Sequence, residues 1–473
     1  MAVQNIARVQ VDAHRTRPAY VCSKGQWLVA LSCIAVALSL YSIAIWRTFP
    51  ATATDVGGDY AYVAWRIGRG AMLYRDVLGQ QTPLLYLLGA AAYRLWPRPD
   101  VFLAIALGTR ALTALAVLGL ARACRFPPVA ACVATLIYLL LPMGFFFGAR
   151  FEPNILIALG GVLATLALTD LSPRRAVLAG LICGLSVMAK LTFAPIVLAF
   201  ALYLLVTRRS LLWPFVVSTL GVLLIATGVG ITYAGPDFIE GAYLAHVGST
   251  LSGANLVMSM RYVWRVEGLT VLAALVGALL AARQAGSGRL LALYLLGGIA
   301  TLGATVSVGS LAPEMLAGEP AIALCATFAV QRAVTAWNTH YAGRRIFHQS
   351  PFVLVVVLLV VGQALAVRND ALALREGQPS ARLGCLLRAL QNRDHRAGAV
   401  VAPAYAAFLA QRPLVAGLSD LFNWSIRVRR GDQTAQAQVK TVLAAVSTKH
   451  IAVIAFDSDD PLPPQVERAV VTS

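Results

Sequence analysis

Long apolar runs separated by short basic loops make up most of the chain. A membrane-spanning helix needs roughly 20 apolar residues. This rule predicts spans near residues 27–48, 101–121, 127–148, 152–171, 210–232, 268–283, 290–311, 319–337 and 351–367. The pattern therefore predicts an α-helical polytopic membrane protein.

One apolar stretch does not fit a single span. About thirty apolar residues, more than one span needs and fewer than two full spans need, lie between basic pairs at 174–175 and 208–209. Lys190 and Pro195 interrupt this stretch, which predicts two short helices that meet there, with Lys190 towards the outer face. Counting the hairpin as two crossings gives about eleven in all, with the N-terminus inside.

The composition of the chain and the positions of its charges agree with this arrangement of membrane spans. The chain has 473 residues, of which 59% are hydrophobic and 13% charged, and its mean hydropathy is +0.72, which excludes an ordinary soluble fold. The formal charge of +18 would suggest nucleic acid as a partner of a soluble protein. Here the basic residues gather in short loops, such as 122–125 and 208–209, as cytoplasmic loops do. Nucleic acid is therefore not an expected partner.

The two ends of the chain receive different predictions. Basic residues precede the first apolar run and no clean cleavage site follows it, so we expect a retained first span. Residues 368–473 have a mixed polar composition, with strand-like runs at 399–401 and 451–454 between helical patterns. We therefore expect a transmembrane domain over residues 1–367 and a small α/β extracytoplasmic domain over residues 368–473.

The first outer loop, at about residues 50–100, combines acids with aromatic rings. These side chains are Asp55, Asp59, Asp76 and Asp100 together with Tyr60, Tyr62, Trp65, Tyr74, Tyr86, Tyr93 and Trp96. Rings can stack on the apolar faces of a sugar while carboxylates accept hydroxyl protons, so the combination suits a sugar site. The alternative is an interfacial aromatic belt with solvated acids.

Three stretches of this loop, 59–70, 73–76 and 80–86, resemble the first outer loop of one glycosyltransferase group. The group is the GT-C glycosyltransferases related to protein O-mannosyltransferases and lipid A aminoarabinose transferases. The resemblance continues through Arg110 and the 150–153 stretch to Lys190 and covers about the first 210 residues. It implies a polyprenyl-phosphate-linked sugar as donor.

The loop departs from the family pattern in two places. The family opens the loop with an adjacent acidic pair, whereas Val56-Gly57-Gly58 separates Asp55 from Asp59 here. The lysine of the family's Lys-Pro-Pro is replaced by Gln81, followed by Thr82-Pro83. Another cation must therefore contact the donor phosphate, or the ligand differs.

The resemblance implies roles for the acids and rings of the loop. Asp55 or Asp59 would be the general base that deprotonates the acceptor hydroxyl, with inversion at the anomeric carbon. Their alternative role is turn formation around the glycines at 57–58. Contacts with substrate are expected from Asp76, Tyr60, Tyr62, Tyr74 and Gln81. For Asp76, capping or pairing with Arg75 is the alternative.

Three basic side chains are candidates for binding the donor phosphate: Lys190, Arg110 and Arg150. A charge deep in an apolar run costs at least about 2.5 kcal/mol unless it is paired or faces a polar cavity. A lipid-linked phosphate would supply the anion for these cations. The alternative for Arg110 and Lys190 is snorkelling to the lipid headgroups.

Glu152 resembles the family's acid in the second outer loop. In that role it would help to hold a divalent metal, Mg²⁺ or Mn²⁺, or orient the acceptor. A plain ion pair with Arg150 is the alternative.

Together these features predict a membrane glycosyltransferase of the bacterial inner membrane. It would move a sugar from a polyprenyl-phosphate donor to an extracytoplasmic glycan, lipid or protein, with membrane lipid as its surroundings. One alternative is a transporter or flippase of lipid-linked sugars, although no inverted repeat is visible. The other is a non-catalytic GT-C-like binding protein, because the altered position at Gln81 is compatible with lost activity.

Overall fold

The structure is a computed structural model of the 473-residue chain. It describes residues 24–52, 57–79, 81–244, 251–284, 286–306 and 312–340, and in the tail residues 400, 404–414, 418, 428, 433–447 and 466. Within these residues the chain forms helices and two isolated β-bridges, which join Leu73 to Val77 and Val400 to Leu414, and no longer strand.

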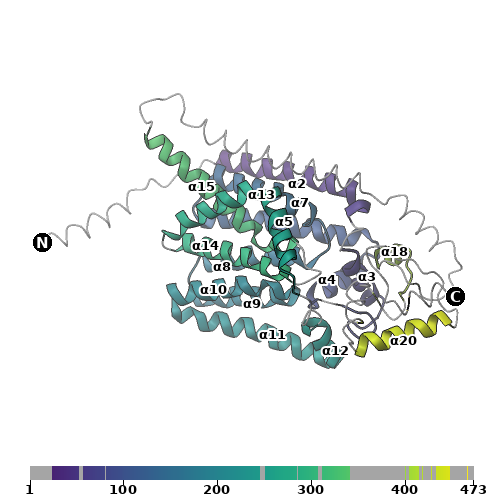
Figure 1. The fold of residues 1–473 in the computed structure, drawn as a ribbon. Coiled ribbons are helices and arrows are strands. Elements are labelled where there is room, and N and C mark those ends of the chain that lie inside the picture. Colours follow the sequence, from purple (N-terminus) through teal and green to yellow (C-terminus); the bar gives the residue numbers. More distant parts are fainter. Residues whose placement is uncertain are drawn as a thin grey trace.

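Most of the described chain is a bundle of apolar helices (Figure 1). These are α2 (Lys24–Thr52), α5 (Asp100–Ala123), α6 (Pro128–Leu140), α8 (Pro153–Leu168), α9 (Pro173–Ala189), α10 (Ala194–Thr207), α11 (Leu212–Ala234), α13 (Gly253–Ala282), α14 (Ser287–Ala300) and α15 (Glu319–His340). Figure 1 shows α2 along one edge of the bundle and α11 along the opposite edge.

Within the residues that the structure describes, four stretches are long and apolar enough to cross a membrane: Asp100–Ala123, Arg209–Ala234, Gly253–Ala282 and Ser287–Val306. Shorter apolar helices lie beside them, among them Pro128–Leu140 and Pro153–Leu168. The structure thus agrees with a multi-pass membrane protein. The predicted number of about eleven crossings stays a prediction.

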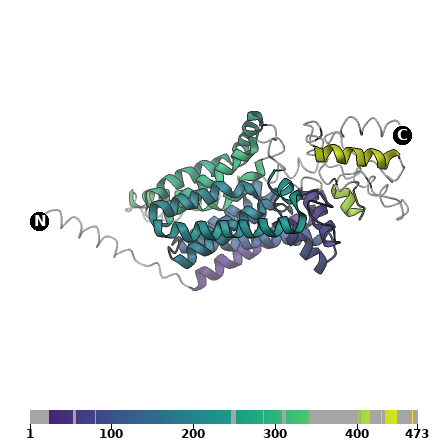
Figure 2. The ribbon, with the colours of Figure 1, turned by 90° about the horizontal axis from the view of Figure 1, so that it is seen from below.

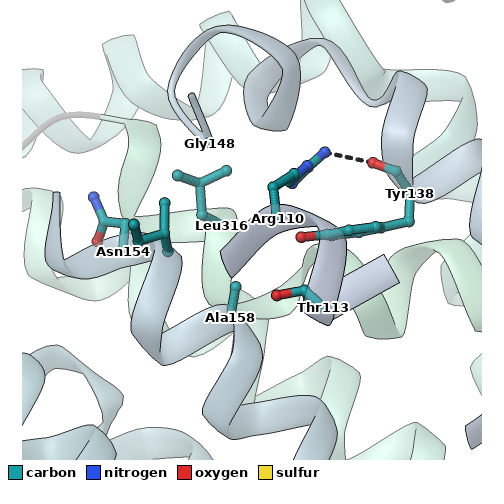
Figure 3. A pocket seen from close by; sticks show the side chains of 8 residues that line it. Arg110, Thr113, Tyr138, Gly148, Asn154, Ala158 and Leu316 are labelled. Atoms are coloured by element: carbon teal, nitrogen blue, oxygen red, sulfur yellow. Dashed lines mark hydrogen bonds between the residues drawn. The ribbon is translucent and has the colours of Figure 1, made fainter. Parts of the chain in front are cut away.

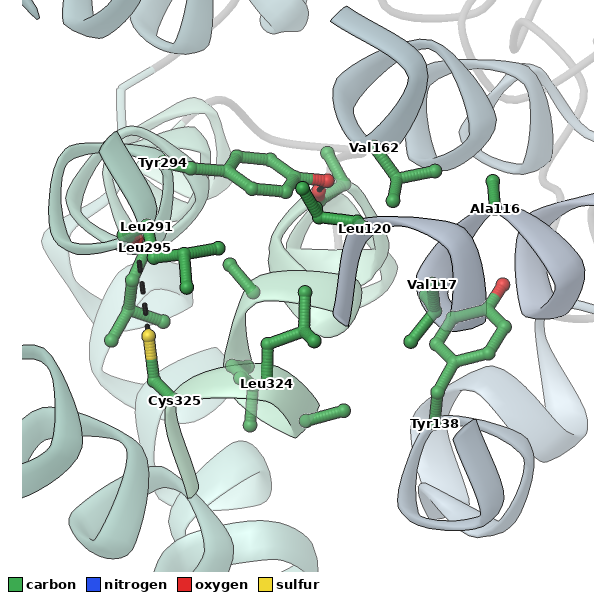
Figure 4. Close-up of a cluster of buried hydrophobic side chains, with 14 of the residues drawn as sticks. Ala116, Val117, Leu120, Tyr138, Val162, Leu291, Tyr294, Leu295, Leu324 and Cys325 are labelled. Carbon is green, nitrogen blue, oxygen red and sulfur yellow. Dashed lines mark hydrogen bonds between the residues drawn. The ribbon is translucent and has the colours of Figure 1, made fainter. Parts of the chain in front are cut away.

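Small residues allow the helices of the bundle to approach closely. A Cβ added to Gly277 of α13 would strike the backbone oxygen of Cys325 in α15. Such close backbone contacts favour association of helices in lipid, where van der Waals packing replaces the hydrophobic effect. Figure 4 shows the buried side chains nearby, with Tyr294 and Leu295 on one side and Val117 on the other.

The predicted hairpin is confirmed. Helix α9 ends at Ala189, Lys190 is extended with φ −160° and ψ 129°, and the 3₁₀ turn η1 (Leu191–Phe193) leads into α10. Pro195 lies in the first turn of α10, where its missing N–H costs no helical hydrogen bond. Lys190 therefore lies at the tip between the two helices.

Two predicted spans have different bounds in the structure. The span at 127–148 is broken at Pro142, because proline cannot donate to the preceding turn, and the short helix α7 (Pro142–Phe146) follows. The span predicted at 268–283 begins at Gly253, where the Ser252 hydroxyl caps the helix by accepting from Asn255 N–H at 3.4 Å. The charges before residue 268 lie within this helix and do not end it.

Short helices gather at one end of the bundle (Figures 1 and 2). They are α3 (Gly57–Gly68), α4 (Leu84–Leu95), α12 (Pro236–Ile239) with η3 (Glu240–Leu244), and α18 (Ala404–Leu409) of the tail. A further tail helix, α20 (Gln433–Ser447), also lies at this end (Figure 2). The strand-like run at 451–454, the span at 351–367 and the domain boundary near 367 lie outside the described residues. The α/β character of the tail is not confirmed by its described residues.

The tail packs on α3. Val400 and Leu414 share a buried cluster with Tyr62 and Phe238. Leu414 N–H donates a hydrogen bond to Tyr62 Oη at 2.7 Å. Arg69 donates to Gln411 Oε1 at 2.6 Å. The tail is therefore fixed to the first outer loop by both apolar and polar contacts.

Replacing Tyr62 by Phe removes the acceptor for Leu414 N–H and leaves the ring in place. We expect a loss of about 1 kcal/mol in the docking of the tail, the usual net value of one hydrogen bond. Amide hydrogen exchange at Leu414 measures this loss as faster exchange. Tyr93→Phe is the matched control, because the Tyr93 hydroxyl lies near the same cluster and has no hydrogen bond among the described residues. Equal exchange in both variants would contradict the expectation.

Candidate functional site

A buried polar cluster lies where the hairpin tip meets the start of α8. Lys190 Nζ donates to Asn154 Oδ1 at 3.0 Å and to Glu314 Oε1 at 2.5 Å. Glu314 belongs to the 3₁₀ helix η5 (Ala312–Gly318), and its second oxygen accepts from Thr192 Oγ1 at 2.8 Å. Lys190 is 7% exposed and Glu314 4%. The charge of Lys190 is therefore paired inside the protein.

Two further charged residues extend this cluster. Asn154 Nδ2 donates to Glu152 Oε2 at 3.3 Å, and Glu152 Oε1 lies 3.9 Å from Arg150 Nη1. The Arg150 guanidinium lies over the ring of Phe147, 4.6 Å from its centroid. Burial raises the pKa of Glu152, while the charges of Arg150 and Lys190 oppose that rise. We name Arg150, Glu152, Asn154, Lys190, Thr192 and Glu314 the Lys190 cluster.

The first outer loop lies against this cluster. Thr82 Oγ1 donates to Val187 O at 3.2 Å, one turn before Lys190. Burial raises the pKa of Tyr60, and nearby acidic groups raise it further: Tyr86, Glu152, Asp59 and Glu314. The rings of Tyr60 and Tyr86 lie 5.8 Å apart. The structure thus places Tyr60 close enough to Asp59 and to the carboxylates of Glu152 and Glu314 to feel their charges.

Asp59 and Gln81 keep accessible positions at this face. Asp59 lies in the first turn of α3 and, like Gln81, is partly exposed. Gln81 presents its backbone oxygen to Tyr74. Asp55, the other candidate base, lies outside the described residues.

Two rings predicted to bind substrate make structural contacts instead. Tyr62 is fully buried and accepts from Leu414. Tyr74 has a left-handed backbone with φ +70°, its hydroxyl donates to Gln81 O at 2.6 Å, and its ring meets Phe238 edge-on at 5.5 Å. A Cβ on Gly241 would strike the Tyr74 ring. Buried packing therefore holds the strained backbone of Tyr74.

For Asp76 the structure shows the alternative role. Asp76 accepts from Met72 N–H at 2.9 Å and from Arg75 Nε at 3.0 Å. The hydrogen bond from Arg75 lowers the pKa of Asp76. These contacts close the turn at residues 72–77.

Arg110 belongs to a second buried cluster. Its Nη1 donates to Glu319 Oε2 at 2.9 Å and its Nη2 to Tyr138 O at 2.5 Å, and the guanidinium lies 3.9 Å from the centroid of the Tyr138 ring. The backbone N–H of Met143 donates to Glu267 Oε1 at 2.8 Å. All three charged residues are at most 2% exposed. We name Arg110, Tyr138, Glu267 and Glu319 the Arg110 cluster.

Arg110 has an anion within the protein. The sequence predicts a donor phosphate as its partner, and the structure pairs it with the Glu319 carboxylate. Phosphate binding by Arg110 stays a prediction. A Cβ on Gly144 would strike both Arg110 and Glu319, so only glycine fits beside this pair. Snorkelling of Arg110 to the headgroups is wrong, since its side chain is buried.

A cavity of about 10 Å³ lies between the two clusters (Figure 3). It is lined by Arg110, Thr113, Tyr138, Gly148, Asn154, Ile155, Ala158 and Leu316. Figure 3 shows Asn154 on one side of it and Arg110 with Tyr138 on the other. This space is close to the smallest that holds one water molecule and is too small for a sugar or phosphate.

Several solved structures are similar to this one, among them these three. ArnT from Cupriavidus metallidurans bound to undecaprenyl phosphate matches with a TM-score of 0.60 and 14% identity, over 83% of this chain and 86% of that chain. The same protein in the apo state matches with a TM-score of 0.60 and 15% identity, over 82% of this chain and 86% of that chain. The oligosaccharyltransferase from Archaeoglobus fulgidus in complex with Zn and sulfate matches with a TM-score of 0.50 and 14% identity. The match covers 80% of this chain and 61% of that chain.

The chain has the GT-C glycosyltransferase fold. No protein-family model matches the sequence, and no curated protein matches it. At these identities the similarity shows the GT-C fold alone, so the chemistry must be argued from the side chains.

Protein groups lie against the predicted metal ligand. Glu152 Oε2 accepts from Asn154, and Glu152 Oε1 lies 3.9 Å from Arg150 Nη1 without a hydrogen bond in the described part of the chain. Within the described residues no three His, Cys, Asp or Glu side chains lie close enough to hold a metal ion. Arg150 and Lys190 also place positive charge beside Glu152. The described residues around Glu152 therefore do not fit a divalent cation, and Mg²⁺ or Mn²⁺ stays a sequence prediction.

Six polar residues of the two clusters were not singled out from the sequence: Tyr138, Asn154, Thr192, Glu267, Glu314 and Glu319. A signal for two of them exists, because every buried cation needs an anion. Glu314 and Glu319 flank the start of the last described apolar helix and are the available acids there. Nothing in the sequence, however, assigns one to Lys190 and the other to Arg110.

Glu319→Gln tests the Arg110 cluster. The substitution leaves the buried charge of Arg110 without its anion, so we expect a loss of roughly 3–5 kcal/mol in stability. Thermal unfolding in detergent measures this as a lowered Tm. Asp76→Asn, which breaks the exposed pair with Arg75, is the matched control and should change Tm little. A similar Tm for both variants would mean that Glu319 does not neutralise Arg110.

Proposed function

We propose that this protein is a membrane glycosyltransferase that uses a polyprenyl-phosphate-linked sugar as donor. The observation on which this depends is the meeting of Lys190 and Arg150 with the first outer loop, at residues far apart in the sequence. The GT-C fold and the undecaprenyl phosphate bound by the similar ArnT support the choice of donor.

In this proposal the donor phosphate binds at Lys190, with Arg150 nearby. The loop has Gln81 where the related family has lysine, so a cation from elsewhere must contact the phosphate. Lys190 is buried, lies at the hairpin tip and is next to the loop through the Thr82 hydrogen bond. Arg110 is not used in this proposal, because its side chain lies in the other cluster, where it pairs with Glu319.

The reaction is a single displacement with inversion. Asp59 or Asp55 takes the proton of the acceptor hydroxyl as its oxygen bonds to the anomeric carbon. The bond between that carbon and the phosphate oxygen breaks, and the oxygen keeps the electron pair. Lys190 stabilises the charge that develops on the phosphate. The partly exposed ring of Tyr60 offers a stacking surface for a sugar.

We place the reaction on the outer side of a bacterial inner membrane, with the N-terminus cytoplasmic. The contacts of Val400 and Leu414 with α3 support a tail that lies on the same side as the first outer loop. The tail domain, 368–473, would then border the entry of the acceptor, which is a glycan, lipid or protein. The transmembrane domain, 1–367, would hold the donor.

A transfer assay tests the proposal. The purified protein is incubated with radiolabelled polyprenyl-phosphate sugars extracted from membranes, together with the extracted acceptors. We expect transfer by the parent, a loss of roughly 10²–10⁴-fold in Asp59→Asn if Asp59 is the base, and weakened donor binding in Lys190→Gln.

Asp170→Asn is the control, because Asp170 forms an exposed pair with Arg175 at 4.0 Å in a predicted cytoplasmic loop. Donor binding by the parent without transfer from any donor would contradict the enzyme and favour a non-catalytic binding protein. Unchanged transfer in Asp59→Asn with loss in Asp55→Asn would assign the base to Asp55.

A further inference from the structure

The Lys190 cluster is electrically balanced before any ligand enters. Its cations are Lys190 and Arg150, and its anions are Glu314 and Glu152. A phosphate brought to Lys190 adds negative charge to this buried set, where charges are poorly screened. The phosphate must therefore compete with a carboxylate that is already bound.

Glu314 is the carboxylate in direct competition. It accepts from Lys190 Nζ and from Thr192 Oγ1, so one carboxylate is bound by two donors of the hairpin tip. Glu152 is bound instead by Asn154 and Arg150. The donors that hold Glu314 are those that an oxygen-rich anion such as phosphate would use.

The backbone of Glu314 is anchored while its side chain reaches the cations. Thr301 Oγ1 donates to Glu314 O at 2.8 Å. In the proposal that follows, the Glu314 side chain moves away from Lys190 while its backbone stays anchored at Thr301.

We infer that Glu314 expels the polyprenyl phosphate product by competing with it for Lys190 and Thr192. The inference rests on the proposed function. In the transfer the acceptor oxygen bonds to the anomeric carbon and the phosphate oxygen leaves with the electron pair. The phosphate thereby changes from a diester with one charge to a monoester with about 1.5 to 2 charges at neutral pH.

Because of this change in charge, Glu314 disfavours binding of the monoester product more than binding of the diester donor. Its carboxylate repels the monoester product more strongly than the diester donor, because repulsion grows with the charge on the phosphate. Glu314 therefore tolerates the donor and disfavours the product at the same cations. A site without this carboxylate would bind its own product tightly and release it slowly.

The test compares two soluble probes, farnesyl phosphate and its methyl diester, of which only the first has a phosphate that can lose a second proton. Their binding to the full-length protein in nanodiscs is measured by calorimetry for the parent, Glu314→Gln and Lys190→Gln. Gln keeps the volume of Glu and can still accept from Thr192. Glu240→Gln is the matched control, because Glu240 is exposed and lies in the short helix η3.

We expect Glu314→Gln to bind farnesyl phosphate about tenfold more tightly than the parent, equivalent to about 1.4 kcal/mol. The gain for the methyl diester should be smaller. Equal gains in affinity for both probes in Glu314→Gln, or weaker binding of farnesyl phosphate, would overturn the inference. If Lys190→Gln still weakened binding of farnesyl phosphate, the proposed phosphate site would stand. Binding that does not depend on Lys190 in any variant would overturn the proposed phosphate site itself.

Discussion

Burying a charge away from water costs several kcal/mol unless an opposite charge lies beside it. Two cations in this bundle meet that requirement with carboxylates far away in the sequence, Lys190 with Glu314 and Arg110 with Glu319. Both carboxylates come from the stretch at 312–319, so one short segment neutralises the charges of Arg110 in α5 and of Lys190 at the end of α9. The approach of η5 and α15 to α5 and α9 depends on these pairs.

The two pairs have different surroundings and hence different uses. Glu319 lies beside Gly144 in a place where even one methyl group would clash, and the pair is closed to any ligand larger than water. The pair of Glu314 is buried as well, but Thr192, which donates to it, is partly exposed, and Thr82 of the first outer loop donates to Val187 one turn before Lys190. We expect the closed pair to stabilise the bundle, and in our proposal the other pair exchanges its carboxylate for a phosphate.

Much of the helical framework could be predicted from apolar runs, because a span in lipid has a fixed length. The hairpin tip at Lys190 followed from a charge and a proline in one apolar stretch. The break at Pro142 does not show in hydropathy, because the residues on both sides of the proline are apolar. The early start of α13 at Gly253 does not show either, because charged residues lie within that helix.

The candidate site was predictable only in part. Lys190, Arg150 and Glu152 were named from the sequence, and the structure places them in one cluster. Arg110 was expected to meet a donor phosphate, and the structure pairs it with Glu319, because the pairing of charges depends on which helices are neighbours. Tyr62 and Asp76 were placed in the site by the resemblance of the first outer loop to a known family, and their hydrogen bonds in the structure belong to the fold.

The hydrogen bond between Tyr62 and Leu414 spans 352 residues of chain. During synthesis, α3 emerges early, and its partner Leu414 is added 352 residues after Tyr62. The contacts between α3 and the tail can therefore form only after the helices between them have been made. In the proposed function, a chain made only as far as these helices has an incomplete face at the first outer loop.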